Sequence, residues 1–406
     1  MRQRTGQSFH QFKREANVAT FPNDFSRHVN FENRPYFWPA GNFHVVTDLG
    51  EAMEALKNPL LSADRSSFFI SRMPNMDLSL IEDFFSVVSK MMVMSDGEDH
   101  SRKRQAAQLG FEDHVLDKFR SKVAISVDSL LESALSKKDV NFCDDVAKRL
   151  PSTVLADLFC IPEQDRVEFY NNSIAMTAFF GGGTGYENED GIKVNKAAST
   201  LKTYFSELIA KRKQMPGEDY ISSLLKAQDR FNLSDGEIIS QAIMMLVAGQ
   251  VTTTDQMCNN MFLLASSLED QIALKNNPSL ISNALEEYNR FDPAVTFIFR
   301  VARQATQIGD QHIKAGDTVF ISNHCVNRTG LDHGEQINIH RKGIQHMAYG
   351  YGAHFCIGAK LARMEMNLLF KTLITKYPHL KVKMASRDHY SLSFSGFDQL
   401  ILEKVQ

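Results

Sequence analysis

The sequence has no long apolar run, a single tryptophan and no large excess of charge of either sign. No stretch reaches the roughly 18 apolar residues that a membrane-spanning helix needs. Residues 1–21 are polar and mixed in charge, which is not the pattern of a signal peptide. A net charge of -3 gives no overall attraction to nucleic acid or to anionic lipid. We therefore expect a cytoplasmic protein that binds neither nucleic acid nor membrane.

Cysteine is also scarce, and the chain has no internal repeat or low-complexity linker. The five cysteines are widely scattered: Cys143, Cys160, Cys258, Cys325 and Cys356. An odd, scattered set does not form a disulfide framework and is typical of a reducing compartment. A hydrophobic fraction of 43% and a charged fraction of 23% are ordinary for a globular protein.

The most informative stretch is His346–Glu365, which has Cys356 at its centre. Three glycines flank the cysteine: Gly350, Gly352 and Gly358. Glycine lets a flat ligand come close to the main chain. From Leu361 the apolar residues recur at helical spacing until Pro378, so Cys356 is expected just before a helix. The N–H groups and dipole of a helix N-terminus lower the pKa of a thiol, and the resulting thiolate is a nucleophile or a metal ligand.

The spacing of His354 keeps the nucleophile interpretation open. In an extended loop His354 projects to the same side as Cys356, two residues later. A histidine at hydrogen-bonding distance would serve as the base of a cysteine protease or an acyl-transfer enzyme. The flanking glycines suit a wide planar ligand better than a peptide.

From Tyr349 to Gly358 the residues read Tyr-x-x-Gly-x-His-x-Cys-x-Gly. This segment resembles the haem-binding loop of the cytochrome P450 superfamily, which usually reads Phe-x-x-Gly-x-(His or Arg)-x-Cys-x-Gly. The resemblance implies that Cys356 is the metal ligand of haem b (heme b, iron protoporphyrin IX), and that Gly350 and His354 also contact this cofactor. Tyr349 replaces the usual Phe, whose ring lies near the sulfur in the family, so the electron density on the ligand can differ.

Three more basic residues match haem contacts of the family. His100 and Arg104 are one helical turn apart and share a face, which suits either a bound carboxylate or solvent. The resemblance implies that both contact a haem propionate. Arg300 matches a third such position, and Glu287 and Arg290 match the Glu-x-x-Arg pair of the family.

Ser234-x-x-Glu237 is a capping box, and it predicts a helix of ~30 residues that ends near Ser267. The middle of this helix is weak because it contains Gly249 followed by β-branched residues over 251–254. Threonine hydroxyls can also bond the carbonyl four residues back and loosen the helix. The weakness indicates either a functional groove or simply an imperfect buried helix.

Ala248-Gly249-x-x-Thr252-Thr253 resembles the oxygen-binding groove of the superfamily. The resemblance implies a catalytic set of Ala248, Gly249 and Thr252, in which Thr252 hydrogen-bonds bound dioxygen and helps to deliver protons. The acidic position of the family motif is Val251, which cannot relay a proton. The candidates to replace it are an ordered water, a substrate group, Gln250, Asp255 and Gln256.

The resemblance runs from about His100 to Arg363 and implies a single cytochrome P450 domain over residues 1–406. It implies a mainly α fold with a small β region, with haem between the long central helix and the cysteine-ligand helix. It also implies a monomeric monooxygenase that oxidises a small organic substrate of secondary metabolism. Electrons would come from a separate ferredoxin and ferredoxin reductase, since the chain has no flavin or iron–sulfur motif. A basic docking face is expected from Arg102, Lys103, Lys360 and Arg363.

Three stretches are expected near the substrate. Residues 66–99 are rich in Phe and Met, which fill cores but cover the substrate pocket in the family. Gly181–Gly185 lacks the Lys-Ser or Lys-Thr of a phosphate-binding loop and is expected to be the hinge of a lid. A hairpin at Leu392–Leu402 is expected to touch the substrate with its tip. A further hairpin arm is expected over Ile313–Ile321.

Two alternatives to the monooxygenase remain. Val251 leaves room for a haem-thiolate enzyme that uses peroxide, or that catalyses a coupling or rearrangement with less need for proton relay. A non-catalytic haem sensor or carrier is the other. Thr252, Glu287 and Arg290 argue against it, because they match positions of the catalytic family.

Overall fold

The computed structural model describes residues 36–38, 42–71, 73–180, 186–387 and 393–405, and most of this chain is helical. The α-helices are α3 (Leu49–Lys57), α4 (Ser66–Ser71), α5 (Glu82–Val88), α6 (Gly97–Gln108), α7 (Asp113–Leu135), α8 (Arg149–Leu158), α9 (Arg166–Phe180), α10 (Asn188–Gln214), α11 (Tyr220–Ala227), α12 (Asp235–Ala265), α13 (Leu268–Asn276), α14 (Ile281–Phe291), α15 (Asn323–Val326) and α16 (Ala359–Lys376). Short 3₁₀ segments lie at η2 (Leu78–Ile81), η3 (Met92–Met94), η4 (Leu109–Phe111), η6 (Glu163–Asp165), η7 (Pro278–Leu280) and η8 (Gly352–His354), and a π-helical turn at η5 (Cys143–Ala147). None of the helices in these ranges is long and apolar enough to cross a membrane.

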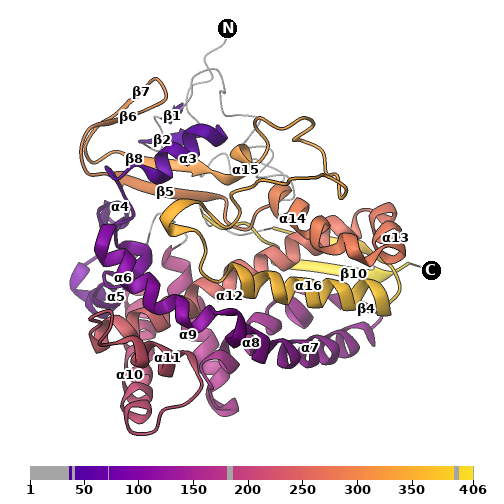
Figure 1. Ribbon diagram of the computed structural model, residues 1–406, viewed down its shortest axis with the longest axis horizontal. Helices are drawn as coiled ribbons and strands as arrows, with labels where there is room; N and C mark the ends of the chain where they lie inside the picture. The colour runs from indigo at the N-terminus through magenta and orange to yellow at the C-terminus, as the bar shows by residue number, and fades with distance from the viewer. Residues whose placement is uncertain (1–35, 39–41, 72, 181–185, 388–392, 406) are drawn as a thin grey trace.

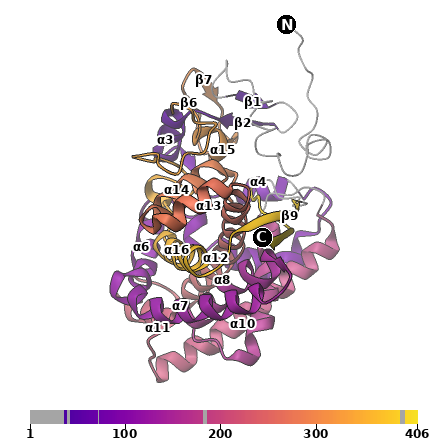
Figure 2. The same cartoon turned by 90° about the vertical axis from the view of Figure 1, so that its right-hand side faces the viewer.

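The strands of the described residues form three small sheets. Their bounds are β1 (Tyr36–Trp38), β2 (Phe43–Val46), β3 (Leu61–Ser62), β4 (Asp139–Asn141), β5 (Phe297–Ala302), β6 (Thr306–Ile308), β7 (Gln311–Ile313), β8 (Thr318–Ser322), β9 (Leu380–Ser386) and β10 (Gln399–Lys404). The largest sheet has the order β1-β2-β8-β5-β3 and lies at one side of the helical body, together with α3 (Figures 1 and 2). The other two sheets are β4-β10-β9 and the β6-β7 hairpin. This is the expected mainly α fold with a small β region.

The segment Ile313–Ile321 does not form one arm of a hairpin as predicted. Its first residue belongs to β7, which pairs with β6, whereas β8 pairs with β5 and, in parallel, with β2. Every residue of β8 is buried, so this strand needs a neighbour on both edges. Gly316 makes the turn between them with a φ of +87°, a conformation that glycine adopts without strain.

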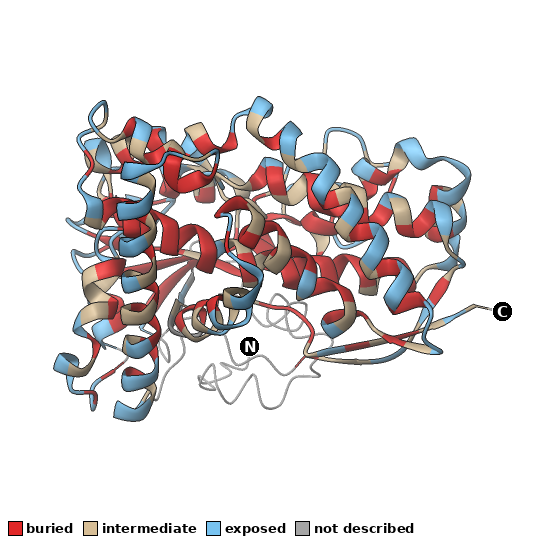
Figure 3. Cartoon of the chain, turned by 90° about the horizontal axis from the view of Figure 1, so that it is seen from below, coloured by how far each residue is buried: buried red, intermediate tan, exposed pale blue. Residues whose placement is uncertain are grey.

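The long helix α12 begins at the predicted capping box and runs through the middle of the molecule. Ser234 Oγ accepts a hydrogen bond from the Glu237 N–H at 3.2 Å, and the Glu237 carboxylate accepts one from the Ser234 N–H at 2.8 Å. The helix has 31 residues, which is ~46 Å. It packs against α5, α8, α9, α10, α14 and α16, and buried residues are concentrated in the interior of the helical body (Figure 3).

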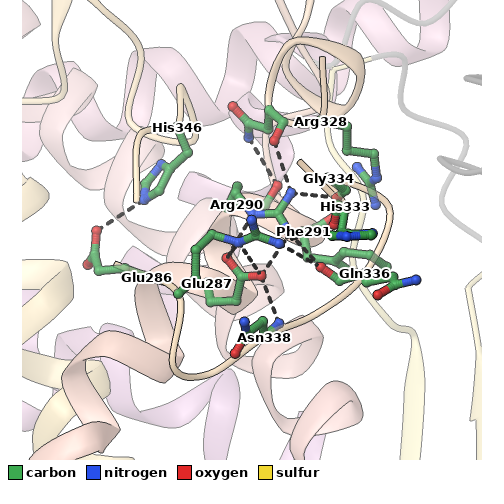
Figure 4. Close-up of polar contacts among 12 residues, drawn as sticks. Glu286, Glu287, Arg290, Phe291, Arg328, His333, Gly334, Gln336, Asn338 and His346 are labelled. Carbon is green, nitrogen blue, oxygen red and sulfur yellow. Dashed lines mark hydrogen bonds and ion pairs between the residues drawn. The ribbon is translucent and has the colours of Figure 1, made fainter. Parts of the chain in front are cut away.

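The pair Glu287 and Arg290 joins α14 to the following loop (Figure 4). Both side chains are 0% exposed, and the guanidinium donates from Nε and Nη2 to the carboxylate at 2.8 Å each. Its remaining N–H groups donate to the carbonyls of Asn327, Gly334 and Gln336. All of the Arg290 donors are therefore used, and the predicted pairing of Glu287 with Arg290 is confirmed.

Further hydrogen bonds connect the Glu287–Arg290 pair to the cysteine loop. Arg341 donates to the Glu287 carboxylate through Nε at 3.1 Å and to the carbonyls of Asp332 and His333. The side chain of Asn327 accepts a hydrogen bond from the Met347 N–H at 2.7 Å. The residues that lead to Cys356 are thus fixed relative to α14 by buried polar contacts.

Candidate active site

A cavity of about 350 Å³ lies between the middle of α12 and the cysteine loop at the start of α16. Its lining comes from α6, α9, α12, β5, the cysteine loop and α16, and most of the lining side chains are apolar. The predicted site residues all line it: His100, Arg104, Ala248, Gly249, Thr252, Arg300, Gly350, His354 and Cys356. Residues from distant parts of the sequence therefore meet around one space.

Cys356 is held by the backbone of its own loop. Its N–H donates to the Tyr349 carbonyl at 2.8 Å, and Gly350 and Gly352 have φ angles of +74° and +71°, which glycine adopts most easily. The helix α16 starts only at Ala359, so the cysteine lies just before a helix N-terminus as predicted. Cys356 is accessible to solvent and lines the cavity.

The sequence predicts a lowered pKa for the Cys356 thiol, whereas in the structure this pKa is raised. Burial raises the pKa of the thiol above its ordinary value, although the N–H groups of Gly358 and Ala359 and the charge of Arg104 act in the opposite direction. The helix N-terminus contributes as predicted, but desolvation of the charged form outweighs it. Metal coordination deprotonates a thiol outright, so a bound iron would supply the missing stabilisation.

Five basic side chains gather at one side of the cavity. They are Arg65, His100, Arg104, Arg300 and His354. The rings of His100 and His354 lie 3.9 Å apart between centroids. Within the described part of the chain, Arg300 donates only to the adjacent Phe299 carbonyl. Burial lowers the pKa of Arg300 to about 10, and burial and the surrounding cations lower the pKa of His354 to about 2. The pKa of His100 is lowered as well, chiefly by burial, so both histidines are favoured in the neutral form. Arg65, Arg104 and Arg300 keep their positive charge, and buried charges of one sign favour a bound anion.

Arg65 was not recognised in the sequence. Burial, followed by repulsion from Arg300, lowers its pKa to about 9, and its guanidinium lies 4.9 Å from the ring centroid of Phe299. The nearby carboxylate of Asp96 accepts hydrogen bonds from Ser62 and Arg303 instead. No motif marks Arg65, because only the fold brings it beside Arg300.

These residues fit haem b. The cysteine sulfur faces a mainly apolar cavity that suits a porphyrin, and the five basic side chains form the positively charged edge that two propionates require. Glu365 of α16 is the single acidic side chain among the described lining residues, and no basic group contributes to its pKa. The arginines of the cavity therefore have no acidic partner among the described lining residues, although Asp96 acts on Arg65 and Arg300 from outside the lining.

The groove in α12 lies on the side of the cavity away from Cys356. The Thr252 hydroxyl donates to the Ala248 carbonyl one turn back at 2.6 Å, as predicted for threonine in a helix, while α12 stays a continuous α-helix through this region. At Gly249 an added Cβ would lie 3.2 Å from Leu155 Cδ2. Glycine therefore lets α8 pack closely against the groove.

Of the three side chains that were considered as replacements for the missing acid, only Gln256 lines the cavity. Gln250 turns toward α8, where it accepts from Ser152 Oγ at 3.1 Å and donates to the Lys148 carbonyl. Asp255 packs against Gly396, at which an added Cβ would lie 2.2 Å from Asp255 Oδ1. Gln250 and Asp255 are thus directed away from the cavity.

Buried amides connect the groove to the cysteine loop. Gln256 Nε2 donates to Asn260 Oδ1 at 3.0 Å, Asn260 Nδ2 donates to Asn289 Oδ1 at 3.0 Å, and Asn289 Nδ2 donates to the Tyr349 hydroxyl at 3.3 Å. The Arg363 guanidinium lies 4.2 Å from the centroid of the Tyr349 ring. The hydroxyl that distinguishes Tyr349 from the usual Phe is therefore bonded within the protein.

Of the predicted basic docking face, Lys103 is buried and cannot take part, and each of its four members forms an ion pair within the chain. For Arg102, Lys360 and Arg363 the docking face stays a prediction. Arg102 pairs with Asp99 and Glu237, and Lys103 is buried and pairs with Asp99. The other two pairs are Lys360 with Asp113 at 2.8 Å and Arg363 with Glu286 at 2.7 Å. None of the four is an uncompensated surface charge.

The segments expected near the substrate contribute unequally. Of the Phe and Met residues between 66 and 99, only Met91 and Met92 line the cavity, and the described remainder belongs to or packs against the core. Gly181–Gly185 lies outside the described residues. The hairpin expected over Leu392–Leu402, with Ser395-Gly396 at its tip, is wrong in its bounds, because β10 pairs with β9 and β4. Ser393 and Phe394 line the cavity, whereas Ser395 and Gly396 do not.

Comparisons with known proteins point to one family. The family model described as Cytochrome P450 matches residues 184–396. The biotin biosynthesis cytochrome P450 of Bacillus subtilis (strain 168) is 30% identical over 305 residues, which cover 74% of this chain and 76% of the relative. The cytochrome P450 monooxygenase PikC of Streptomyces venezuelae is 29% identical over 301 residues, with coverage of 72% and 70%. 

Among solved structures, P450BioI in complex with an acyl carrier protein that carries hexadec-9Z-enoic acid superposes with a TM-score of 0.86 and 25% identity. The match covers 95% of this chain and 98% of that one. CalO2 superposes with a TM-score of 0.86 at 22% identity, which shows the shared fold. The fold, the cavity and the relatives together show that the chain belongs to the cytochrome P450 superfamily and is a haem b monooxygenase of the type found in bacteria.

Proposed function

We propose that Cys356 is the thiolate ligand of the haem iron, and that His100, Arg104, Arg300 and His354, together with Arg65, hold the propionates. The observation that carries this proposal is the position of the Cys356 sulfur, which faces the apolar cavity beside the group of buried cations. Thiolate-ligated haem supplies the oxygen-inserting chemistry. The protein binds the substrate, excludes water and handles protons.

In this proposal Ala248, Gly249 and Thr252 form the oxygen-binding groove. The Thr252 hydroxyl gives its own proton to the Ala248 carbonyl, so its oxygen remains free to accept a hydrogen bond from a water or from the reacting oxygen species. Replacing Thr252 by Ala removes that acceptor. We expect the variant to consume reducing equivalents at a normal rate but to release more peroxide and less product. An unchanged product yield would remove Thr252 from the mechanism.

The proposed substrate is a small, mainly apolar organic molecule of secondary metabolism. The part of the cavity above the groove is built from apolar side chains of η3, α9 and β5 and from Phe394, which suit such a ligand. The names of relatives point the same way, since they include a polyketide biosynthesis cytochrome P450 and nocardicin C N-oxygenase. A panel of apolar compounds, tested by the shift that each causes in the haem spectrum, would identify the class.

Electrons are proposed to come from a ferredoxin and its reductase. The sequence contains no flavin motif and no iron–sulfur cysteine spacing, which supports the delivery of electrons by a separate protein. We further propose that residues 1–406 form one domain that acts as a cytoplasmic monomer. One large core cluster with members from Phe43 to Leu402, beside a smaller second cluster with members from Val46 to Met347, supports the one-domain arrangement.

The first test is the absorbance spectrum of the dithionite-reduced protein with carbon monoxide. Wild type should show the strongly red-shifted Soret band of a thiolate-ligated haem, and Cys356→Ser should lose that shift. Cys160→Ser is the matched control, because this cysteine lies outside the cavity, and it should behave as wild type. A band without the shift in wild type would refute the ligand assignment, and no haem at all would return Cys356 and His354 to a nucleophilic role.

A peroxide-using enzyme is the second candidate, and Val251 is the observation that favours it. Without an acid at this position, reductive oxygen activation needs another proton source. Turnover with peroxide alone should then exceed turnover with ferredoxin, its reductase and O2. The reverse order would support the monooxygenase with ferredoxin.

A further inference from the structure

Two buried cysteines, Cys143 and Cys258, lie in contact with each other outside the haem site. Both are 0% exposed, and neither lines the cavity. The Cys258 thiol donates to Cys143 Sγ at 3.4 Å, and the Cys143 thiol donates to the Phe397 carbonyl at 3.3 Å. The two cysteines are 115 positions apart in the sequence, so only the fold brings their sulfur atoms together.

The pair is one of three contacts that join one face of α12 to the segment that leads into α8. Gln250 Nε2 donates to the Lys148 carbonyl at 3.2 Å. One turn later, Thr254 Oγ1 donates to the Ala147 carbonyl at 3.1 Å. Cys258 follows after one more turn and reaches η5, since residues four apart share a face of a helix. A covalent bond at this end of the row would therefore fasten α12 to η5.

The other three cysteines have no cysteine neighbour within the described part of the chain. Cys160 is exposed, Cys356 lines the cavity, and Cys325 is 1% exposed. Cys325 is thus about as deeply buried as the pair, but it has no second thiol beside it. A difference in reactivity between Cys325 and the pair would reflect the contact of the two sulfur atoms rather than their burial.

Two thiols in contact can be oxidised to a disulfide by a peroxide. In the first step the O–O bond breaks, one thiol becomes a sulfenic acid, and water is released. In the second step the other sulfur attacks the sulfenic acid, the S–O bond breaks, and a second water leaves. The sum is 2 Cys–SH + H2O2 → Cys–S–S–Cys + 2 H2O, in which each sulfur loses one electron and the peroxide oxygens are reduced.

The two steps differ in rate for reasons that the structure supplies. Burial raises the pKa of the Cys258 thiol, and the thiolate is the reactive form, so the first step is slow. The second step is fast, because the partner sulfur is already in place and the reaction is intramolecular. The pair should therefore respond to prolonged exposure to peroxide rather than to a brief one.

We propose that Cys143 and Cys258 form a reversible disulfide when the protein meets hydrogen peroxide, and that this bond fastens α12 to η5. Peroxide is released whenever O2 is activated without product formation, and α12 lines the cavity in which that would happen. The thiol chemistry itself needs no haem, so the proposal does not rest on the proposed function. A dithiol reductant returns the pair to thiols, as in other disulfides that form transiently in reducing compartments.

Peptide mapping detects the bond directly. The haem-containing protein is treated with excess hydrogen peroxide, denatured with N-ethylmaleimide and digested without reductant. Mass spectrometry should find one cross-linked pair of peptides, which contain Cys143 and Cys258 and are lighter by two hydrogen atoms than their sum. The Cys325 peptide should carry the maleimide. Free thiols at Cys143 and Cys258, in a sample whose exposed Cys160 has been oxidised, would overturn the proposal.

Thermal unfolding shows whether the bond forms in the folded protein. Closing a loop of 115 residues lowers the entropy of the unfolded chain, so the oxidised protein should melt about 6 °C higher before reduction with dithiothreitol than after it. Comparing the same sample before and after reduction cancels any damage of peroxide to the haem.

Two variants complete this test. Cys258→Ala removes the pair and should show no change on reduction, whereas Cys160→Ser keeps the pair and should match wild type. The wild-type comparison stands even if Cys258→Ala does not fold. A cross-link that leaves the melting temperature unchanged would mean that it forms between unfolded segments, and would refute the fastening of α12.

Discussion

Arg290→Met should destabilise the protein far more than the loss of an ion pair at the surface. The change keeps most of the side-chain volume but removes the hydrogen bonds that Arg290 donates to Glu287 and to the carbonyls of Asn327, Gly334 and Gln336 (Figure 4). Breaking a fully buried pair from one side costs about 3–5 kcal/mol, because the remaining charge stays buried. Arg341 still contacts the carboxylate, so the lower end of this range applies if Arg341 moves closer.

This free energy converts into a measurable shift in melting temperature. An unfolding entropy of about 2.1 cal/mol/K per residue gives ~0.85 kcal/mol/K for the 406 residues. The melting temperature should therefore fall by about 4–6 °C. Thermal unfolding followed by circular dichroism, at equal haem content, measures the shift.

Arg120→Met provides the matched control. Arg120 and Asp117 also stand three residues apart on a helix, but their side chains are 58% and 68% exposed and their charged atoms are 3.6 Å apart. Such a pair contributes roughly 0–1 kcal/mol, so its melting temperature should change by about 1 °C or less. Equal shifts in the two variants would refute the argument that burial and the carbonyl contacts make the Arg290 pair strong.

Three further outcomes are expected. In Glu286 the hydrogen bonds from Arg363 and His346 outweigh burial and lower the pKa from 4.5 to about 2, so its contribution to stability is present above pH 4.5 and is lost as the pH falls toward 2. In Glu286→Gln the free energy of unfolding, measured by urea titration, should fall less between pH 4.5 and pH 2 than in wild type. An equal fall in both proteins would contradict this expectation. Gly110→Ala should cost about 1–3 kcal/mol, since the new Cβ would lie 2.3 Å from Tyr220 Cδ2. Gly236→Ala, which meets only the flexible Lys90 at 3.5 Å, should instead stabilise α12 by up to ~1 kcal/mol in the same melts. Tyr349→Phe should cost about 1 kcal/mol by leaving Asn289 Nδ2 with one partner fewer, and no change in stability would show that this hydrogen bond contributes nothing.

The elements that the sequence predicts well are those set by short spacings. The capping box at Ser234 and Glu237 marks the start of α12, and the three-residue spacing of Glu287 and Arg290 predicts their contact. The cysteine loop is recognisable because its glycines and its cysteine act within ten consecutive residues. In each case the interacting groups are neighbours along the chain.

The features that the sequence does not reveal depend on distant contacts or on burial. Arg363 pairs with Glu286, which is 77 residues away, so this pairing could not be foreseen. The i,i+4 pair of Asp99 and Lys103 was visible in the sequence, but the burial of Lys103 was not. The pKa of Cys356 rises because desolvation depends on the whole fold.

The bonds from Gln256 through Asn260 and Asn289 to Tyr349 have a consequence for assembly of the enzyme. They join the two faces of the haem site through protein atoms alone. Three of the four groups are amides, which do not titrate, and the pKa of the Tyr349 phenol is raised by burial, so the connection persists across the pH range in which the protein is folded. These hydrogen bonds can thus hold the groove and the cysteine loop at a fixed distance in the apoprotein. The cofactor then binds in a cavity that is already formed.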